Sequence, residues 1–403
     1  MTRQISDRQA AVLLAIGIVS LKLLILPALI SRFTIRYSYV TIVLGVAIDF
    51  MFMLIILSIM KKFPHLTFSE LIERSFGKFT RYILNFILAV YFFFKGVLII
   101  KETHNYFNET LFENINWWFF VIPFLMLIFF MMLKDLKTIA RSVEFFFWLI
   151  AVGIIFTIFV PIKTVDFTNL LPLFGRGSEN IFTSLFYCNF SFGDYFVLLM
   201  VMGRVSFKPN STKKIVTFAL LSDFLLIAFY VIFVSVFGEI GVNQNLAISD
   251  LPLHSTITSA IGRLDWIIII IWSITLIFQA GALFSKSCAC LTESYKFKSK
   301  HIPATIIIVS IFIFIHHFYL DLEAILELII SLPFSIITCA IQILYPVILI
   351  IAALKQKDNN KFVATSAVFK GQIKIQYTDI AKPELGKKKL NFFLSTIKAK
   401  EET

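Results

Sequence analysis

The chain of 403 residues is 58% hydrophobic and 15% charged, with a formal net charge of +12. Soluble domains carry about 25% charged residues, so this composition excludes one, and its hydrophobicity excludes a disordered chain. Four cysteines in 403 residues are too few for a disulfide-stapled secreted scaffold. The composition therefore predicts a protein that crosses the membrane several times.

A membrane-spanning helix needs about 20 mostly apolar residues. Ten apolar segments along the chain predict ten transmembrane helices. They cover residues 9–31, 38–60, 80–100, 116–133, 142–161, 180–203, 214–237, 262–285, 303–319 and 324–353. The first is not expected to be a cleaved signal peptide, because no small-residue cleavage site follows it. The last is long enough to tilt, to kink at Pro333 or Pro346, or to lie partly in the membrane interface.

Lysine and arginine are concentrated in alternate loops. With the N-terminus inside, the predicted inner loops carry 18 of these residues before residue 355, Lys286 among them, and the outer loops carry six. The positive-inside rule then places both termini in the cytoplasm and requires an even number of spans. The loops 101–115 and 238–255 are expected outside.

The charge divides the chain into two predicted parts, a ten-helix transmembrane domain over residues 1–354 and a basic cytoplasmic tail over residues 355–403. The tail holds 11 Lys and five acidic residues. Lysine next to the last span is explained by orientation in the membrane, and attraction to anionic lipid is the alternative. No nucleic-acid partner is expected.

Ten helices divide into two sets of five that enter the membrane from opposite sides. Such halves form an inverted repeat, in which the first helix of each half is broken near the bilayer midplane and binds substrate or ions. The first span carries Gly17, Ser20 and Lys22 at mid-depth and Pro27 further on. The sixth combines Asn189, Ser191, Gly193 and Asp194. The predicted fold class is thus an all-α polytopic membrane protein with a 5+5 inverted repeat and broken helices 1 and 6.

These residues form the predicted ligand-binding site. Unwound backbone near Gly17–Ser20 and Ser191–Gly193 offers N–H groups to a carboxylate and C=O groups to an ammonium group. Asp194 suits an amine, and Lys22 suits a carboxylate or takes the place of a bound cation. Tyr91 in span 3 and Gln279 in span 8 are predicted walls. The alternative is ordinary helix packing by small residues.

Other ionisable residues within the spans are candidates by position. Asp49 is deep enough for an ion pair with Lys22 to be the cheapest arrangement, whereas Lys95, Asp223 and Asp265 lie near enough to predicted helix ends for snorkelling to explain them. The remaining candidates in the spans are Glu144 and Glu327.

No catalytic, metal or cofactor site is predicted. None of the six histidines has metal-site spacing, and Cys288 and Cys290 are too few ligands for a metal, so a packed pair is the preferred interpretation. No phosphate-binding loop is present. An enzyme is not expected.

Several local patterns resemble the B subunits of bacterial spore germinant receptors, a branch of the amino acid–polyamine–organocation transporter superfamily. Each pattern is weak alone, and their order and spacing over about residues 4–354 carry the resemblance. They are Ile5-Ser6-Asp7-Arg8-Gln9, the segment Lys22–Pro27, Phe63–Glu70 followed by Phe76-Gly77-Lys78, Leu171–Gly177, and Phe192-Gly193-Asp194.

The sequence departs from the family pattern in two places. Residues 36–40 lack the family's aspartate and tryptophan, and only Gly17 remains of the glycine pair of helix 1 in related permeases. The ligand can therefore differ from a simple amino acid. The resemblance implies a subunit of the spore inner membrane that binds a small nutrient, assembles with an A-type membrane subunit and a C-type lipoprotein, and triggers germination.

Two other functions share these features. One is a stand-alone amino acid or amine permease driven by a proton or sodium gradient, and the other is a channel without a specific organic ligand. Neighbouring genes for A-type and C-type subunits favour the receptor, whereas conduction without nutrient favours the channel.

Overall fold

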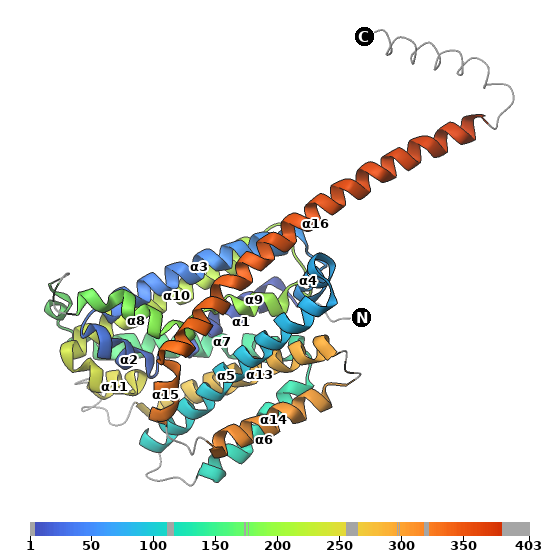
Figure 1. Ribbon diagram of the computed structural model, residues 1–403. Coiled ribbons are helices and arrows are strands. Elements are labelled where there is room, and N and C mark those ends of the chain that lie inside the picture. The colour runs from blue at the N-terminus through green and yellow to red at the C-terminus, as the bar shows by residue number, and fades with distance from the viewer. Residues whose placement is uncertain are drawn as a thin grey trace. The chain divides into compact units, whose positions relative to one another are not determined.

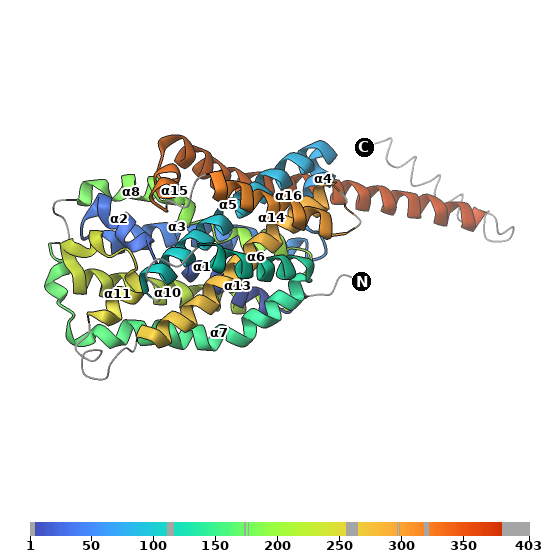
Figure 2. The same cartoon turned by 90° about the horizontal axis from the view of Figure 1, so that it is seen from below.

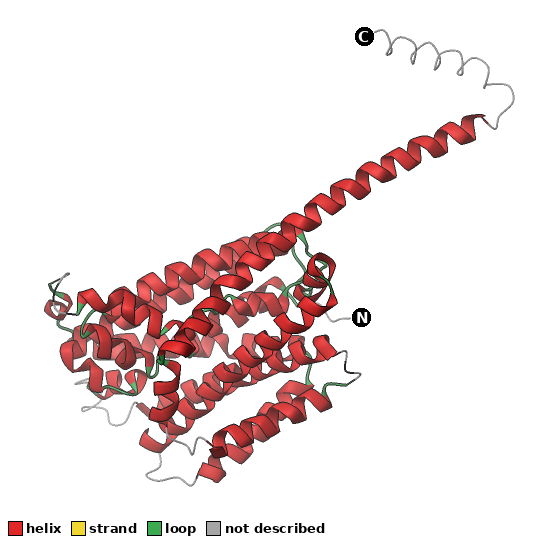
Figure 3. Ribbon diagram, viewed as in Figure 1, coloured by secondary structure: helices red, strands yellow, loops and turns green. Residues whose placement is uncertain are grey.

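The structure, a computed structural model, describes residues 5–110, 117–172, 175, 177–254, 265–295, 297, 299–317 and 322–380. Helices and loops account for these residues (Figure 3), and the described part of the chain contains no strand beyond an isolated bridge between Ile5 and Val205. The prediction of an all-α membrane protein is confirmed at this level.

The described chain as far as Phe159 forms seven α-helices of different lengths (Figure 1). They are α1 (Asp7–Ser20), α2 (Leu26–Thr34), α3 (Ser38–Lys62), α4 (Phe68–Phe76), α5 (Lys78–Thr110), α6 (Trp117–Leu133) and α7 (Leu136–Phe159). Three short 3-10 helices follow, η1 (Val160–Lys163), η2 (Phe167–Leu170) and η3 (Ser178–Asn180).

The second part begins with short helices and continues with long ones. These are α8 (Ile181–Tyr187), η4 (Asn189–Ser191), α9 (Phe196–Val201), α10 (Ser211–Phe237), η5 (Gly238–Asn243), α11 (Ala247–Leu253), α13 (Asp265–Tyr295), α14 (His301–His317), α15 (Leu322–Ile329) and α16 (Leu332–Ile380). Met1–Ile350 and Ile351–Thr403 are separate structural units, and all contacts given below lie within the first.

Six described helices are long and apolar enough to cross a membrane, and a seventh span arises if Ser178–Tyr187 and Asn189–Val201, which meet at 61°, are taken together. Two shorter apolar helices cover Val121–Leu133 and His301–Phe314. Large apolar side chains such as Met51, Phe119 and Phe145 are exposed. Such a surface suits lipid and not water, so the chain is a multi-pass membrane protein.

Helix α1 lies at the centre of the bundle, among α7, α10 and α13 (Figures 1 and 2). All of its residues except Arg8 are buried, as expected for a helix that is apolar on every side. Helices α5 and α13 pack side by side and run antiparallel, and the Ser287 hydroxyl donates to the carbonyl of Ala89 at 2.8 Å. Helix α1 ends directly before the first place where the chain leaves the helical conformation.

The chain leaves the helical conformation in both spans where the sequence predicts a break. The first interruption covers Leu21–Ile25, between α1 and α2, and the second follows η4 at Phe192–Tyr195. The prediction that Gly17–Ser20 is unwound is wrong, because α1 is continuous to Ser20. One helical glycine costs about 1 kcal/mol, too little to end a packed helix, whereas Pro27 in the first turn of α2 suits a helix start.

Three further expectations, two about loops and one about the last span, are corrected. Residues 101–110, predicted outside as a loop, belong to α5, and Lys286, assigned to an inner loop, is buried inside α13. The last span is interrupted at Ile330–Ser331, so that Pro333 stands in the first turn of α16 and does not kink a continuous helix. A helix can continue through polar residues when neighbouring helices bury them. The distribution of charge along the sequence does not show where this happens.

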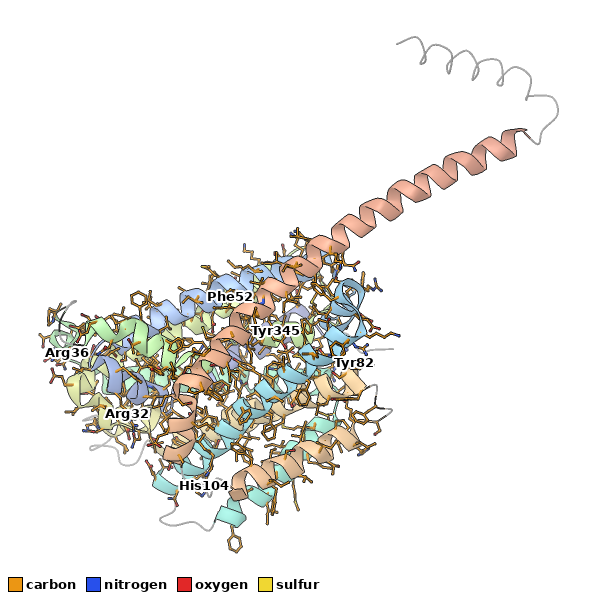
Figure 4. The ribbon with its side chains drawn as sticks, viewed as in Figure 1. Arg32, Arg36, Phe52, Tyr82, His104 and Tyr345 are labelled. Atoms are coloured by element: carbon orange, nitrogen blue, oxygen red, sulfur yellow. The ribbon has the colours of Figure 1, made fainter. Side chains whose placement is uncertain are left out.

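Two of the family-like segments cap helices at one end of the bundle, called here the α4 end. The Ser6 hydroxyl accepts a bond from the Gln9 N–H, and the Gln9 side chain accepts one from the Ser6 N–H. Thr67 and Glu70 form the same reciprocal pair at the start of α4. Both are capping boxes, which satisfy free N–H groups of a helix start. Tyr82 lies towards this end and Arg36 at the opposite, α2 end (Figure 4).

Candidate ligand site at the two helix interruptions

Four charged side chains meet between the two interruptions. Lys22 Nζ lies 2.5 Å from Asp194 Oδ2 and 3.7 Å from Asp49 Oδ2, and Lys95 Nζ lies 3.5 Å from Asp194 Oδ1. Lys22, Lys95 and Asp194 are 1%, 2% and 6% exposed. Two positive and two negative charges balance, as charges in a low-dielectric interior must to limit their desolvation cost.

The backbone of the second interruption is held by side chains from three helices. The carbonyl of Phe192 accepts bonds from Lys95 Nζ at 2.5 Å, the Tyr91 hydroxyl at 3.1 Å and Gln342 Nε2 at 3.4 Å. The Gly193 N–H donates to both oxygens of Asp49, at 3.0 and 2.9 Å. The backbone groups freed by the break are thus satisfied by α3, α5 and α16, as the membrane interior requires.

Gly193 makes this arrangement sterically feasible. Its φ of +81° is a conformation that other residues rarely adopt. A Cβ atom here would lie 2.6 Å from the Tyr91 hydroxyl oxygen and 3.0 Å from Gln342 Nε2. Any side chain would therefore separate the second interruption from α5 and α16.

The first interruption is tied to α10 and α11. The Tyr230 hydroxyl donates to the carbonyl of Lys22 at 2.8 Å, and the Ala247 N–H donates to the carbonyl of Leu24 at 3.3 Å. The Lys22 ammonium also lies 4.9 Å from the centre of the Phe192 ring, a cation–π distance. Lys22 therefore joins the first interruption to the second through its side chain, and to α10 through its backbone carbonyl.

Asn189 links α16 to the start of the second interruption. Its side chain donates to the carbonyl of Ser335 at 2.8 Å and accepts from Thr338 Oγ1 at 2.5 Å. Gln342 Nε2 donates to the carbonyl of Asn189 at 2.8 Å. A polar face of α16 is thus hydrogen-bonded to the broken sixth span at Asn189.

Among the predicted site residues, the structure brings five into one cluster and places four around it. The five are Lys22, Tyr91, Asn189, Gly193 and Asp194. Gly17 and Gln279 face each other, with a Gly17 Cβ position 3.9 Å from Gln279 Nε2. Ser20 is fully buried, its hydroxyl has no hydrogen-bond partner among the described residues, and Ser191 is 6% exposed.

Sequence reasoning missed several members of the cluster. Lys95, assigned to snorkelling, lies in the middle of α5 and contacts Asp194 and Phe192, so that prediction is wrong. The sequence pointed to Asp49 only as a partner of Lys22, and it did not single out Gln342. A lysine in an otherwise apolar span was the available signal for Lys95. Asp265, also assigned to snorkelling, has a side chain outside the described residues.

Ion pairs lie at both ends of the bundle. At the α2 end Arg36 pairs with Glu239 at 2.5 Å and donates to the carbonyl of Leu171 at 2.8 Å. At the α4 end Arg204 pairs with Glu293, which also accepts from the Ser69 hydroxyl at 2.5 Å. The central cluster is buried between these two ends.

The charged groups that meet here are suited to binding a small charged molecule. Within the described ranges no group of three His, Cys, Asp or Glu side chains is placed to hold a metal ion. Broken helices around buried charges, within a bundle of membrane helices, define the class: a membrane protein with a transporter-like fold.

Comparison with known proteins agrees with this class and specifies the family. The family model described as "Spore germination protein" matches residues 4–325. The chain therefore belongs to the spore germination protein family. It is 24% identical over 246 residues to spore germination protein GerQB of Bacillus cereus, covering 61% of this chain and 67% of that protein.

A solved transporter structure shares the fold. It is Mhp1, a nucleobase-cation-symport-1 family transporter, in a closed conformation with bromovinylhydantoin bound. The TM-score is 0.55 at 14% identity, and the match covers 81% of this chain and 75% of Mhp1. At this identity the likeness concerns the fold alone.

Proposed function

We propose that this chain is the membrane subunit of a spore germinant receptor that binds a small nutrient between its two helix interruptions. The observation that carries the proposal is the Lys22–Asp194 ion pair, which joins the two interruptions at 2.5 Å. A nutrient with an ammonium and a carboxylate group would compete for both partners. Its binding would favour one of two conformations, and contacts with other subunits would transmit the change.

The proposed architecture is a ten-helix 5+5 inverted repeat over residues 1–354 with a basic cytoplasmic tail. The two interruptions supply the broken first helix of each half. Both termini would face the cytoplasm, which places the α4 end inside and the α2 end outside. The partners would be an A-type membrane subunit and a C-type lipoprotein in the spore inner membrane, as the family resemblance implies.

The proposed ligand contacts are the residues of the cluster and its walls. Gly193 and Asn189 would present backbone groups, Asp194 would meet an ammonium, and Lys22 a carboxylate. Tyr91 and Gln279 would line the sides, with Gly17, Ser20 and Ser191 nearby. When the ligand separates Lys22 from Asp194, Lys95 would remain the partner of Asp194 and Asp49 the partner of Lys22.

Gly193→Leu tests the site. The leucine would collide with Tyr91 and Gln342, and spores carrying the variant should lose the response to nutrient while keeping normal protein levels. Gly77→Leu is the matched control, because Gly77 has a φ of +91° but nothing within 4 Å of its Cβ position. It imposes similar backbone strain without filling the site, and its response should persist.

Asp194→Asn tests the charge at the same place. It keeps the side-chain shape and should weaken binding of a cationic group by about 1.5–3 kcal/mol, the range for hydrogen bonds to charged groups. An unchanged nutrient dose response in both Gly193→Leu and Asp194→Asn spores would place the site elsewhere.

The second candidate is a gradient-driven amino acid or amine permease, which the fold shared with a transporter favours. Reconstituted protein distinguishes the two. A permease accumulates labelled nutrient in vesicles when a proton or sodium gradient is applied, whereas a receptor subunit binds nutrient without accumulating it.

A further inference from the structure

Lys286 is a buried lysine that the central cluster does not use. It lies within α13 and is 1% exposed. The described residues provide it with no carboxylate partner and no hydrogen-bond acceptor, and its ammonium lies 5.7 Å from the centre of the Phe92 ring. A lysine inside a membrane bundle is costly unless it is paired or used, so an unpaired one indicates function.

The charges around Lys286 leave one positive charge over. Lys286 interacts electrostatically with the charges of Asp194 and Lys95. Asp194 is already paired with Lys22 and Lys95. Asp223 lies in α10 and interacts electrostatically with Lys22 and with the two aspartates of the cluster. A single negative charge beside Lys286 would restore the balance on the α5–α13 side.

The position of Lys286 on its helix connects two regions. Gln279, Lys286, Cys290 and Glu293 follow helical spacing on one face of α13. Gln279 faces Gly17 beside the central site. Cys290 and Glu293 line a small cavity at the α4 end, with a volume of about 10 Å³. Lys286 therefore lies between the central site and that cavity.

We propose that Lys286 is a binding site for a small monoanion, either the carboxylate of the nutrient or a free inorganic anion, at a position on α13 between the central cluster and the α4 end. The carboxylate source rests on the proposed function, whereas the anion site itself does not. A monoanion fits because one ammonium without a carboxylate partner supplies one charge, and the Phe92 ring face cannot neutralise it.

Purified full-length protein tests the site with acetate and chloride as probes. Its melting temperature is followed while each sodium salt is titrated at constant ionic strength against sodium isethionate, a larger anion without a carboxylate. A saturable rise with acetate but not chloride identifies a carboxylate site, and a saturable rise with chloride identifies an inorganic anion site. Absence of a saturable rise with either anion overturns the proposal.

Variants assign the effect to Lys286. Lys286→Met should weaken the apparent anion affinity by about 10- to 100-fold, as expected for loss of a charged hydrogen bond, and Lys286→Arg should retain it. Lys61→Met, at an exposed position, should leave the affinity unchanged. Equal affinity in Lys286→Met and the unsubstituted protein overturns the proposal.

The stability without anion gives an independent readout. Lys95→Met leaves Asp194 with one partner fewer and should lower the melting temperature, whereas Lys286→Met removes an unpaired charge and should not lower it. An equal loss in both variants would make Lys286 a structural residue and overturn the proposal. The nutrient response of Gly193→Leu spores is scored separately, so failure of the receptor function is distinguished from failure of the anion site.

Discussion

Lys22 and Asp194 are 172 positions apart in the chain, and their side chains form a buried ion pair with Nζ and Oδ2 2.5 Å apart. Each residue lies in a stretch where a helix is interrupted. The pair therefore fixes the two interruptions relative to each other, and a ligand that separates its partners changes the spacing of the two broken spans.

Removal of Lys22 should be strongly destabilising. Lys22→Met leaves Asp49 and Asp194 with Lys95 as the remaining ammonium, and breaking a buried pair costs about 3–5 kcal/mol. The double substitution Lys22→Met with Asp194→Leu removes both charges and should recover part of the loss. Chemical unfolding in detergent measures both, and additive losses in the double variant would contradict direct pairing.

The Arg204–Glu293 pair should control access from the α4 end. Glu293 also accepts from Ser69, so Glu293→Gln weakens two contacts across the cavity that Cys290 lines. A loss of about 1 kcal/mol, as for a partly exposed pair, predicts a fivefold faster alkylation of Cys290. The rate is measured with the other three cysteines replaced by serine. Glu239→Gln, at the opposite end, should leave the rate unchanged, and a similar increase there would contradict a local closure.

Stability should depend on pH through Asp250, which lies in α11 outside the membrane-spanning segments. Burial raises the pKa of Asp250 to about 6, with Glu109 adding to the rise, while the Leu246 N–H and His254 oppose it. The folded protein then holds this proton more tightly than the unfolded chain, so stability should fall as the pH rises from about 4 to about 6. Asp250→Asn should flatten the melting temperature over this range, and an unchanged slope would refute the assignment.

Cysteine labelling should define the orientation. Glu109, near the end of α5, and Lys78, at its start, are both exposed. A membrane-impermeant thiol reagent applied to intact cells should modify Glu109→Cys but not Lys78→Cys, because the predicted inner loops carry the lysine and arginine. Modification of Lys78→Cys alone would reverse the proposed topology.

The basic tail should be dispensable for insertion. Its 11 lysines among 49 residues provide charge and no apolar core, so truncation after Gln356 should leave a stable membrane protein. Its lysines should add affinity for anionic lipid, about 1 kcal/mol per residue near the surface. Fractionation and immunoblotting measure the level of the truncated chain, and its disappearance would show that the tail is needed for folding or assembly.

Much of this protein follows from composition and position along the chain. Apolar length identifies membrane helices, because the bilayer fixes how many residues a span needs. The same local reading placed a break in each of the two spans, since glycine and polar residues at mid-depth are unfavourable within a spanning helix. It put the first break at Gly17–Ser20, whereas the chain leaves the helix at Leu21–Ile25. The capping boxes at Ser6 and Thr67 are equally local, because a helix start needs acceptors for its free N–H groups.

What only the tertiary structure decided is which charges face each other. From the sequence, Lys95 is predicted near a helix end and Lys286 in a loop. Both predictions are wrong because the extent of α5 and α13 depends on the packing of these helices and not on the charge of the segment. Lys22 finds Asp194 only when two distant breaks are brought together, and the Asp49 carboxylate meets the Gly193 N–H for the same reason. Sequence identifies a charge in the membrane, but pairing is a matter of distance, and distance between remote segments is set by the packing of the whole bundle.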